Sequence, residues 1–250
     1  MGSSLLQLNK CNLDSASLLA QHGSKLPDSK TNYRQTQMKL LSVNIGRERQ
    51  QQRNDYIETT GIYKIPVNGP VEIKSLGIEG DAICDRKNHG GPDQAIYIYG
   101  GADYAWWEQE LGKEIPPGTF GENLTIGDLE SARFNVGDYL HIGEAILQVT
   151  ASRIPCGTFA ARMSDPQWVK KFRAAERPGL YCRVIKEGMV NAGNEVVIEK
   201  YTGETISILE MFREHYVKDK SQDSLRRHLG APIDIRTRRN MEAGLQKLSA

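Results

Sequence analysis

Short runs of aliphatic and β-branched residues, separated by turn residues, limit the folds open to this chain of 250 residues. Glycine, proline and asparagine stand between the runs, as in Val67-Asn68-Gly69-Pro70. Many short strands with turn signals between them indicate a barrel or sandwich rather than a parallel βαβ sheet. The fold class is therefore expected to be mainly β with α. Strands are expected at Leu40–Ile45, Gly61–Ile65, Val71–Ile73, Ala95–Tyr99, Tyr139–Ile142, Ala145–Thr150, Leu180–Ile185 and Glu195–Glu199.

Two helices are expected within this β region. Asp103–Leu111 is predicted to be helical, with Ala105, Trp106 and Leu111 facing inward, and Asp165–Ala175 is predicted to close over the strand end near Cys156. The adjacent tryptophans Trp106 and Trp107 are interpreted as packing residues rather than a stacking platform for a ligand.

The pattern changes after residue 201. Ser207 and Glu210 have capping-box spacing, which predicts a helix start, with an apolar face at Ile208, Met211, Phe212 and Tyr216. Two further helices are expected at Gln222–Leu229 and Ile233–Leu248, the last of them basic. We expect three parts: a flexible extension at 1–37, a β-barrel domain at 38–201 and a three-helix subdomain at 202–250.

Residues 1–37 are rich in Ser, Gln, Asn and Lys and show no sustained periodicity. They lack the long apolar core of a secretory signal, and their single arginine, Arg34, does not suit an organelle transit peptide. This composition cannot bury enough apolar surface to order the segment.

Charge and cysteine usage exclude several classes of protein. The 32 basic residues nearly balance the 31 acidic ones, which does not favour nucleic-acid binding. No apolar run approaches the ~20 residues that span a bilayer. The four cysteines, Cys11, Cys84, Cys156 and Cys182, form neither a CxxC pair nor a zinc spacing. We therefore expect a cytoplasmic protein in a reducing compartment, without membrane or nucleic-acid partners.

One cysteine stands in a sequence suited to chemistry. Cys156 follows the expected strand Ala145–Thr150 and Pro155, and Gly157 is expected to let the backbone bend sharply behind it. Arg153 would place positive charge near the sulfur and favour the thiolate. The alternative is that Cys156 is a buried structural residue, as free cysteines usually are.

Three loops combine glycine with polar residues. They are Gly77–Asp81 with the residues up to Asn88, His89–Ala95, and Gly118–Leu124. Such loops allow the backbone to come close to a ligand. The alternative is that they are ordinary tight turns in which Asp and Asn bind local backbone.

Taken together, these segments resemble the MOSC domain family, named after the C-terminal domain of molybdenum-cofactor sulfurases, and its stand-alone bacterial branch with a C-terminal helical extension. The matching residues are Gly77–Asp81, His89–Ala95, Phe120–Leu124, Val136–Asp138, Gly143–Val149 and Arg153–Cys156. The resemblance implies a β-barrel-like domain, the molybdenum cofactor (Mo-molybdopterin), and reduction of N-hydroxylated compounds such as purine bases, a detoxification. At the family level it also implies pyridoxal phosphate binding.

The resemblance also assigns roles to residues. Cys156 would ligate the molybdenum and be catalytic, and Asp81, Asn123 and Arg153 would bind the cofactor. His89 would be a second catalytic residue, as a proton donor. We expect the three loops to converge with Cys156 on one pocket, with Arg153 partly exposed to it.

The resulting prediction is a molybdenum-cofactor oxidoreductase that is a monomer or homodimer. No Rossmann fingerprint, haem-attachment pair or iron–sulfur cysteine cluster is present, so an external redox protein would supply electrons. Two alternatives stay open: a sulfur carrier with a persulfide on Cys156, and a non-catalytic cofactor-binding module whose basic tail docks on an enzyme.

Overall fold

Seven strands close into a barrel in the computed structural model, which describes residues 38–85 and 89–248. The hydrogen-bonded order is β13-β9-β10-β11-β7-β8-β1, and β1 pairs again with β13 through Met38 and Val196. Only β7 and β8 run parallel among these pairs. Closure of the sheet pairs the backbone N–H and C=O groups that edge strands would otherwise leave free. The barrel that the turn pattern predicted is confirmed. The strands are β1 (Met38–Gly46), β7 (Ile96–Gly100), β8 (Leu124–Ile126), β9 (Tyr139–Ile142), β10 (Ala145–Ser152), β11 (Leu180–Lys186) and β13 (Glu195–Glu199).

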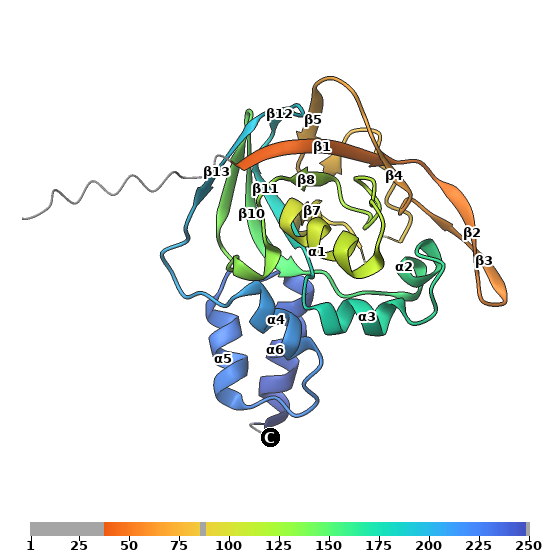
Figure 1. The fold of residues 1–250 in the computed structure, drawn as a ribbon. Helices are drawn as coiled ribbons and strands as arrows, with labels where there is room; N and C mark the ends of the chain where they lie inside the picture. The colour runs from red at the N-terminus through yellow and green to blue at the C-terminus, as the bar shows by residue number, and fades with distance from the viewer. Residues whose placement is uncertain (1–37, 86–88, 249–250) are drawn as a thin grey trace, which may run out of the picture. The chain divides into compact units, whose positions relative to one another are not determined.

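Shorter strands lie outside the barrel (Figure 1). β4 (Lys64–Pro66) extends the sheet from β1, and β5 (Val71–Lys74), β6 (Gly77–Ile78) and β12 (Gly188–Val190) form a three-stranded sheet. β2 (Arg49–Arg53) and β3 (Tyr56–Thr60) form a separate hairpin, which the sequence analysis did not predict. The strand expected at Gly61–Ile65 begins only at Lys64, because Gly61 is taken up in a close backbone contact with Ala82.

α1 (Gly101–Leu111) covers one side of the barrel, and its predicted inward face is right for Trp106 and Leu111, which pack against the core, but wrong for Ala105. Tyr104 and Trp107 are buried, whereas Ala105 is exposed. The helix is rotated because Asp103 is buried too, where it accepts a hydrogen bond from the Ser131 backbone and pairs with Arg177. Trp107 donates to the Tyr99 hydroxyl at 2.8 Å, so its predicted packing role is confirmed.

The region after β10 holds two helices where one was predicted. α2 (Gly157–Arg162) was not expected, and α3 (Trp168–Ala175) begins three residues later than the predicted Asp165. The Asp165 carboxylate instead accepts from the Gln167 backbone just before α3. Phe159 of α2 packs edge to face on Trp168 and Phe172 of α3, and Trp168 in turn contacts Trp107 of α1 in a tilted arrangement.

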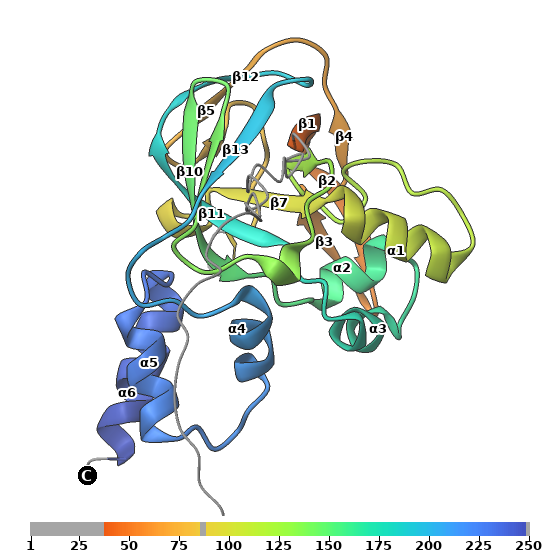
Figure 2. The same cartoon turned by 60° about the vertical axis from the view of Figure 1, so that its left-hand side comes forward.

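The last three helices pack against the barrel (Figures 1 and 2), and the first of them contacts the end of α3, because Arg213 pairs with Glu176. They are α4 (Ile208–His215), α5 (Gln222–Gly230) and α6 (Ile235–Leu248). The Ser207 side chain accepts from the Glu210 backbone at 3.0 Å, which confirms the predicted cap. Ile208, Met211 and Phe212 are buried in the same core as the barrel. The 1–37 extension lies outside the described residues, and the part of the chain described contains no helix long and apolar enough to cross a membrane.

Candidate functional site

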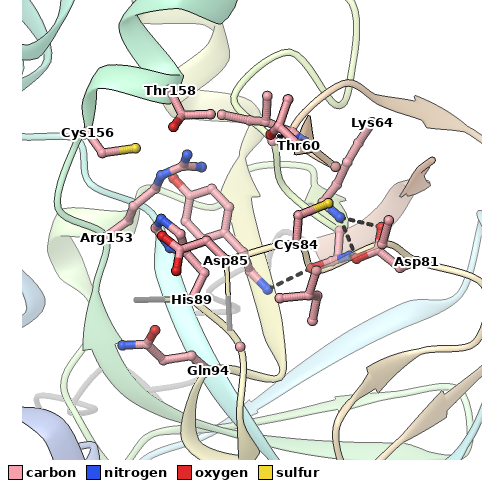
Figure 3. A pocket seen from close by; sticks show the side chains of 18 of the residues that line it. Thr60, Lys64, Asp81, Cys84, Asp85, His89, Gln94, Arg153, Cys156 and Thr158 are labelled. Atoms are coloured by element: carbon pink, nitrogen blue, oxygen red, sulfur yellow. Dashed lines mark hydrogen bonds and ion pairs between the residues drawn. The ribbon is translucent and has the colours of Figure 1, made fainter. Parts of the chain in front are cut away.

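The loops predicted to carry chemistry meet at one pocket (Figure 3). Asp81, His89, Asn123, Arg153 and Cys156 all line it, so the predicted convergence is confirmed. Cys156 and Arg153 lie on one side of the pocket, and Asp81 lies on the other with Lys64. The cavity has a volume of about 150 Å³. The shared location of these residues is observed, whereas their chemical roles stay predictions.

Cys156 precedes the first residue of α2 in extended backbone geometry, with φ −127° and ψ 173°. Burial alone would raise the pKa of its thiol. The hydrogen bond with His89, the Arg153 guanidinium and the backbone N–H of Phe159 outweigh burial and lower the pKa from 9.0 to about 6. A thiol with this pKa is mostly thiolate at neutral pH, the form that binds metals and acts as a nucleophile.

The structure gives a different reason for glycine at position 157 from the predicted one. It does not form a sharp bend, because it is the first residue of α2. A Cβ built on Gly157 would lie 2.4 Å from Nη2 of Arg53, a residue of β2. The absence of a side chain at Gly157 leaves room for the end of the Arg53 side chain, which reaches from the β2–β3 hairpin to the start of α2.

Arg153 is buried, and the prediction that it is partly exposed is wrong: only 4% of its surface is accessible. Its guanidinium carbon lies 4.7 Å from the centre of the Tyr97 ring and 4.4 Å from that of Phe159, and Nη1 donates to the Phe120 carbonyl. These aromatic faces stabilise a cation without solvent. Arg153 therefore acts on the pocket by placing positive charge beside the Cys156 thiolate.

Asn123 and Asp81 bind each other and the surrounding backbone. Asn123 Nδ2 donates to Asp81 Oδ2 at 2.9 Å, and Asn123 Oδ1 accepts from the Tyr97 backbone at 3.1 Å. Asp81 Oδ1 accepts from the Gly46 backbone at 2.8 Å. These bonds fix the wall of the pocket between β1, β7 and the Gly77–Asp81 loop.

Lys64 is a pocket residue that the sequence analysis missed. Its ammonium pairs with both Asp81 carboxylate oxygens, and the side chain is only 7% exposed. Burial lowers its pKa, although Asp81 opposes the shift. A lysine at the start of a short strand is usually exposed, so the sequence carries no signal for its burial.

A second missed group forms the rim of the pocket. Glu58 of β3 accepts from Arg53 at 3.2 Å, from the Thr158 hydroxyl at 3.1 Å and from Gln51 at 3.0 Å. This network ties the β2–β3 hairpin to α2. Its residues come from a polar hairpin and were not recognisable as site residues.

His89 lies between the Tyr181 hydroxyl and the Cys156 thiol. Its Nδ1 is 3.3 Å from the Tyr181 hydroxyl, and the ring also makes a hydrogen bond with Cys156. The imidazole therefore links a buried phenol to the thiol at the pocket.

The donor set of the pocket suits a metal group that brings most of its own ligands. Within residues 38–85 and 89–248, no three His, Cys, Asp or Glu side chains gather as a metal site. Cys156 offers a single soft thiolate, which suits a thiophilic metal. The pocket residues thus fit a cofactor that needs one sulfur ligand from the protein.

Comparison with known proteins identifies the family to which this chain belongs. Residues 85–197 match the family model of the MOSC domain. The chain is 31% identical to YflK of Bacillus subtilis (strain 168) over 196 residues, which cover 78% of this chain and 89% of YflK. The chain therefore belongs to the MOSC domain family, as the sequence motifs predicted.

Two further similarities refine this placement. The crystal structure of YiiM from Geobacillus stearothermophilus matches with a TM-score of 0.69 and 26% identity, covering 83% of this chain and 99% of that one. A protein of Gibberella moniliformis (strain M3125 / FGSC 7600) named as a reductase is 30% identical over 175 residues. That match covers 68% of this chain but only 29% of the fungal protein.

Proposed function

We propose that this protein is a molybdenum-cofactor-dependent reductase of small N-hydroxylated compounds. The observation that carries the proposal is the position and acidity of the Cys156 thiol. It lies at the N-terminus of α2 in the lining of the pocket, and its pKa of about 6 makes it a thiolate at neutral pH. MOSC family membership and the similarity to a protein named as a reductase support oxidoreductase chemistry.

Cys156 would hold the molybdenum, and the cofactor would supply the two-electron redox chemistry. The buried Arg153 would keep the sulfur anionic, and the Asn123–Asp81 hydrogen bond would keep the shape of the pocket that receives the cofactor. On the opposite side of the pocket Lys64 forms an ion pair with Asp81, so the two charges balance there. Asp81, Asn123 and Arg153 would serve the cofactor mainly by shaping its pocket, because their side chains already bind protein groups.

His89 would donate a proton to the leaving oxygen of the substrate. Reduction of a hydroxylamine-type nitrogen to the amine takes up two electrons and two protons and releases water. His89 Nδ1 can exchange a proton with the Tyr181 hydroxyl, and the ring faces the pocket where the leaving oxygen needs protonation. The electrons would come from a separate redox protein.

Metal analysis of protein made in a host that synthesises the cofactor tests the proposal. Wild-type protein should contain stoichiometric molybdenum and pterin and reduce an N-hydroxylated purine base with an artificial reductant. Sulfane sulfur without molybdenum would instead support the sulfur carrier, whose Cys156 persulfide would need the same acidic thiol. Bound cofactor without turnover of any N-hydroxylated substrate would support the non-catalytic module.

A further inference from the structure

The last helix of the chain contacts the segment that follows His89. The backbone N–H of Ile235, at the start of α6, donates to Asp93 Oδ2 at 2.8 Å. On the barrel side, Arg183 of β11 pairs with Asp93 Oδ1 at 3.0 Å. Asp93 belongs to η1 (Pro92–Gln94), the short turn between His89 and β7. The start of α6 is thereby fixed to the pocket loop and to the barrel together.

Arg236 extends this contact towards His89. Its Nη1 donates to Gln94 Oε1 at 2.8 Å, and its Nη2 donates to the Gly90 carbonyl at 3.1 Å. Gly90 directly follows His89, and Gln94 lines the pocket (Figure 3). A planar guanidinium can bridge two acceptors in fixed directions, which a lysine ammonium cannot do in the same way.

The segment that Arg236 holds begins with two glycines, ahead of the η1 turn that Asp93 anchors. Gly90 and Gly91 have φ values of +74° and +84°, in the left-handed region that glycine tolerates. Two successive glycines leave the unrestrained backbone many conformations. The bond to the Gly90 carbonyl therefore restrains the backbone next to the residue that contacts Cys156.

We propose that Arg236 is a positioning residue, which holds the His89–Gln94 loop so that the His89 ring stays against Cys156. The C-terminal helices would then be part of the site rather than an appendage to the barrel. This inference concerns the same pocket as the proposed function, but it does not depend on molybdenum chemistry.

The test uses the full chain made in a host that lacks the cofactor, so that the thiol is free. The rate of Cys156 alkylation by iodoacetamide is followed at one pH by mass spectrometry of the peptide that contains it. The variants are Arg236→Ala, Arg236→Lys, His89→Gln and the double variant Arg236→Ala/His89→Gln. The matched control is Arg239→Ala, since Arg239 is an exposed arginine of the same helix. Arg153, Arg53 and Tyr181, the other charged or titratable groups near the thiol, are unchanged in all variants.

We expect Arg236→Ala and Arg236→Lys to slow alkylation by up to about tenfold, as does His89→Gln, because the hydrogen bond to the thiolate is lost. Arg236→Ala should add nothing in the His89→Gln background. Amide hydrogen exchange in residues 90–95 should become faster in both Arg236 variants, and Arg239→Ala should match the wild type.

A wild-type alkylation rate in Arg236→Ala would overturn the proposal. So would a wild-type rate in Arg236→Lys, which would mean that charge alone suffices. A full additional loss in the His89→Gln background would show that Arg236 acts without His89. None of these readings depends on whether the protein binds molybdenum, so this test and the metal analysis can fail independently.

Discussion

At the scale of single residues, the site depends on how a few charged groups are paired. Arg153 is stacked between aromatic rings, and Lys64 is paired with Asp81. Both cations are desolvated, so their fields are less screened than those of surface charges. The Cys156 thiol lies in the field of Arg153 and is hydrogen bonded to His89, which explains why it ionises despite its burial.

The first prediction is that Cys156→Ala abolishes reduction of N-hydroxylated substrate and the binding of molybdenum. The fold should remain nearly intact, because Cys156 is only partly buried at the edge of the core. Circular dichroism and a thermal melt would check the fold beside the activity assay. Retention of most of the wild-type rate would contradict the assignment.

The control for this variant is Cys182→Ala. Cys182 is fully buried in β11, where burial raises the pKa of its thiol, so it should be chemically inert. Its loss should lower stability by about 1 kcal/mol without removing activity. Cys84 is a poorer control, because it lines the pocket.

The second prediction concerns pH. In protein without cofactor, Cys156 alkylation should be half-maximal near pH 6, well below the value of 9.0 for an unperturbed thiol. Because the folded-state pKa is depressed, the thiolate contributes stability that is complete above about pH 9 and is lost as pH falls through 6. His89→Gln should move the alkylation midpoint upward. A midpoint near 9 in the wild type would show that the surroundings of the sulfur are misassigned.

At the scale of elements, backbone segments meet at the base of the pocket. A Cβ on Gly61 would lie 2.0 Å from the Ala82 carbonyl oxygen, and one on Gly46 would lie 2.0 Å from the Gly61 carbonyl oxygen. The end of β1, the residues after β3 and the loop at Ala82 are therefore in direct backbone contact. No side chain fits between them, which explains why glycine stands at both positions.

The third prediction compares two glycines. Gly61→Ala should destabilise the protein by about 1–3 kcal/mol or more, because the new methyl group meets rigid backbone. Gly157→Ala should change stability by less than about 1 kcal/mol, because it meets only the movable end of Arg53, and alanine favours the helix. Guanidinium unfolding measures both. Equal losses would mean that the Arg53 side chain cannot move aside.

The elements that the sequence could predict are those whose apolar pattern matches one buried face. β9 and β13 begin and end at the predicted residues, and α4 has its predicted cap and apolar face. The β2–β3 hairpin was missed because Arg49–Arg53 is polar on both faces and is stabilised by partners distant in sequence, such as Thr158. Propensity carries no information on such long-range pairs.

At the site, too, the features that local sequence motifs determine could be predicted, whereas those that depend on residues distant in sequence could not. The residues around Cys156 could be identified from glycine-rich loops and the family motif. The burial of Arg153 and Lys64 could not, because it depends on Tyr97, Phe159 and Asp81, which reach the pocket from other elements. Charged residues are almost never buried without such partners, so the sequence favoured exposure.

At the scale of the whole molecule, the barrel and the C-terminal helices share one hydrophobic core. Ile206, Ile208, Phe212 and Ile233 are buried together with strand residues such as Val149. Hydrogen bonds cross the junction as well: Val136 donates to the Ile206 carbonyl at 2.9 Å, and Ile208 donates to the Phe134 carbonyl at 2.8 Å. The predicted boundary at residue 201 therefore marks a change of secondary structure within a continuous core.

The last prediction compares the effects of removing residues 1–37 and residues 202–250. A chain that begins at Met38 should keep its melting temperature and activity, because the composition of residues 1–37 cannot offset an ordering entropy of about 1–2 kcal/mol per residue. A chain that ends at residue 201 should lose on the order of 5 kcal/mol or more, since each large apolar side chain removed from the core contributes about 1.5–3 kcal/mol. Thermal and denaturant unfolding would measure both. A large loss in the first variant would mean that residues 1–37 pack on the barrel. A stable second variant with an unchanged rate of Cys156 alkylation would mean that α4–α6 support neither the core nor the His89 loop.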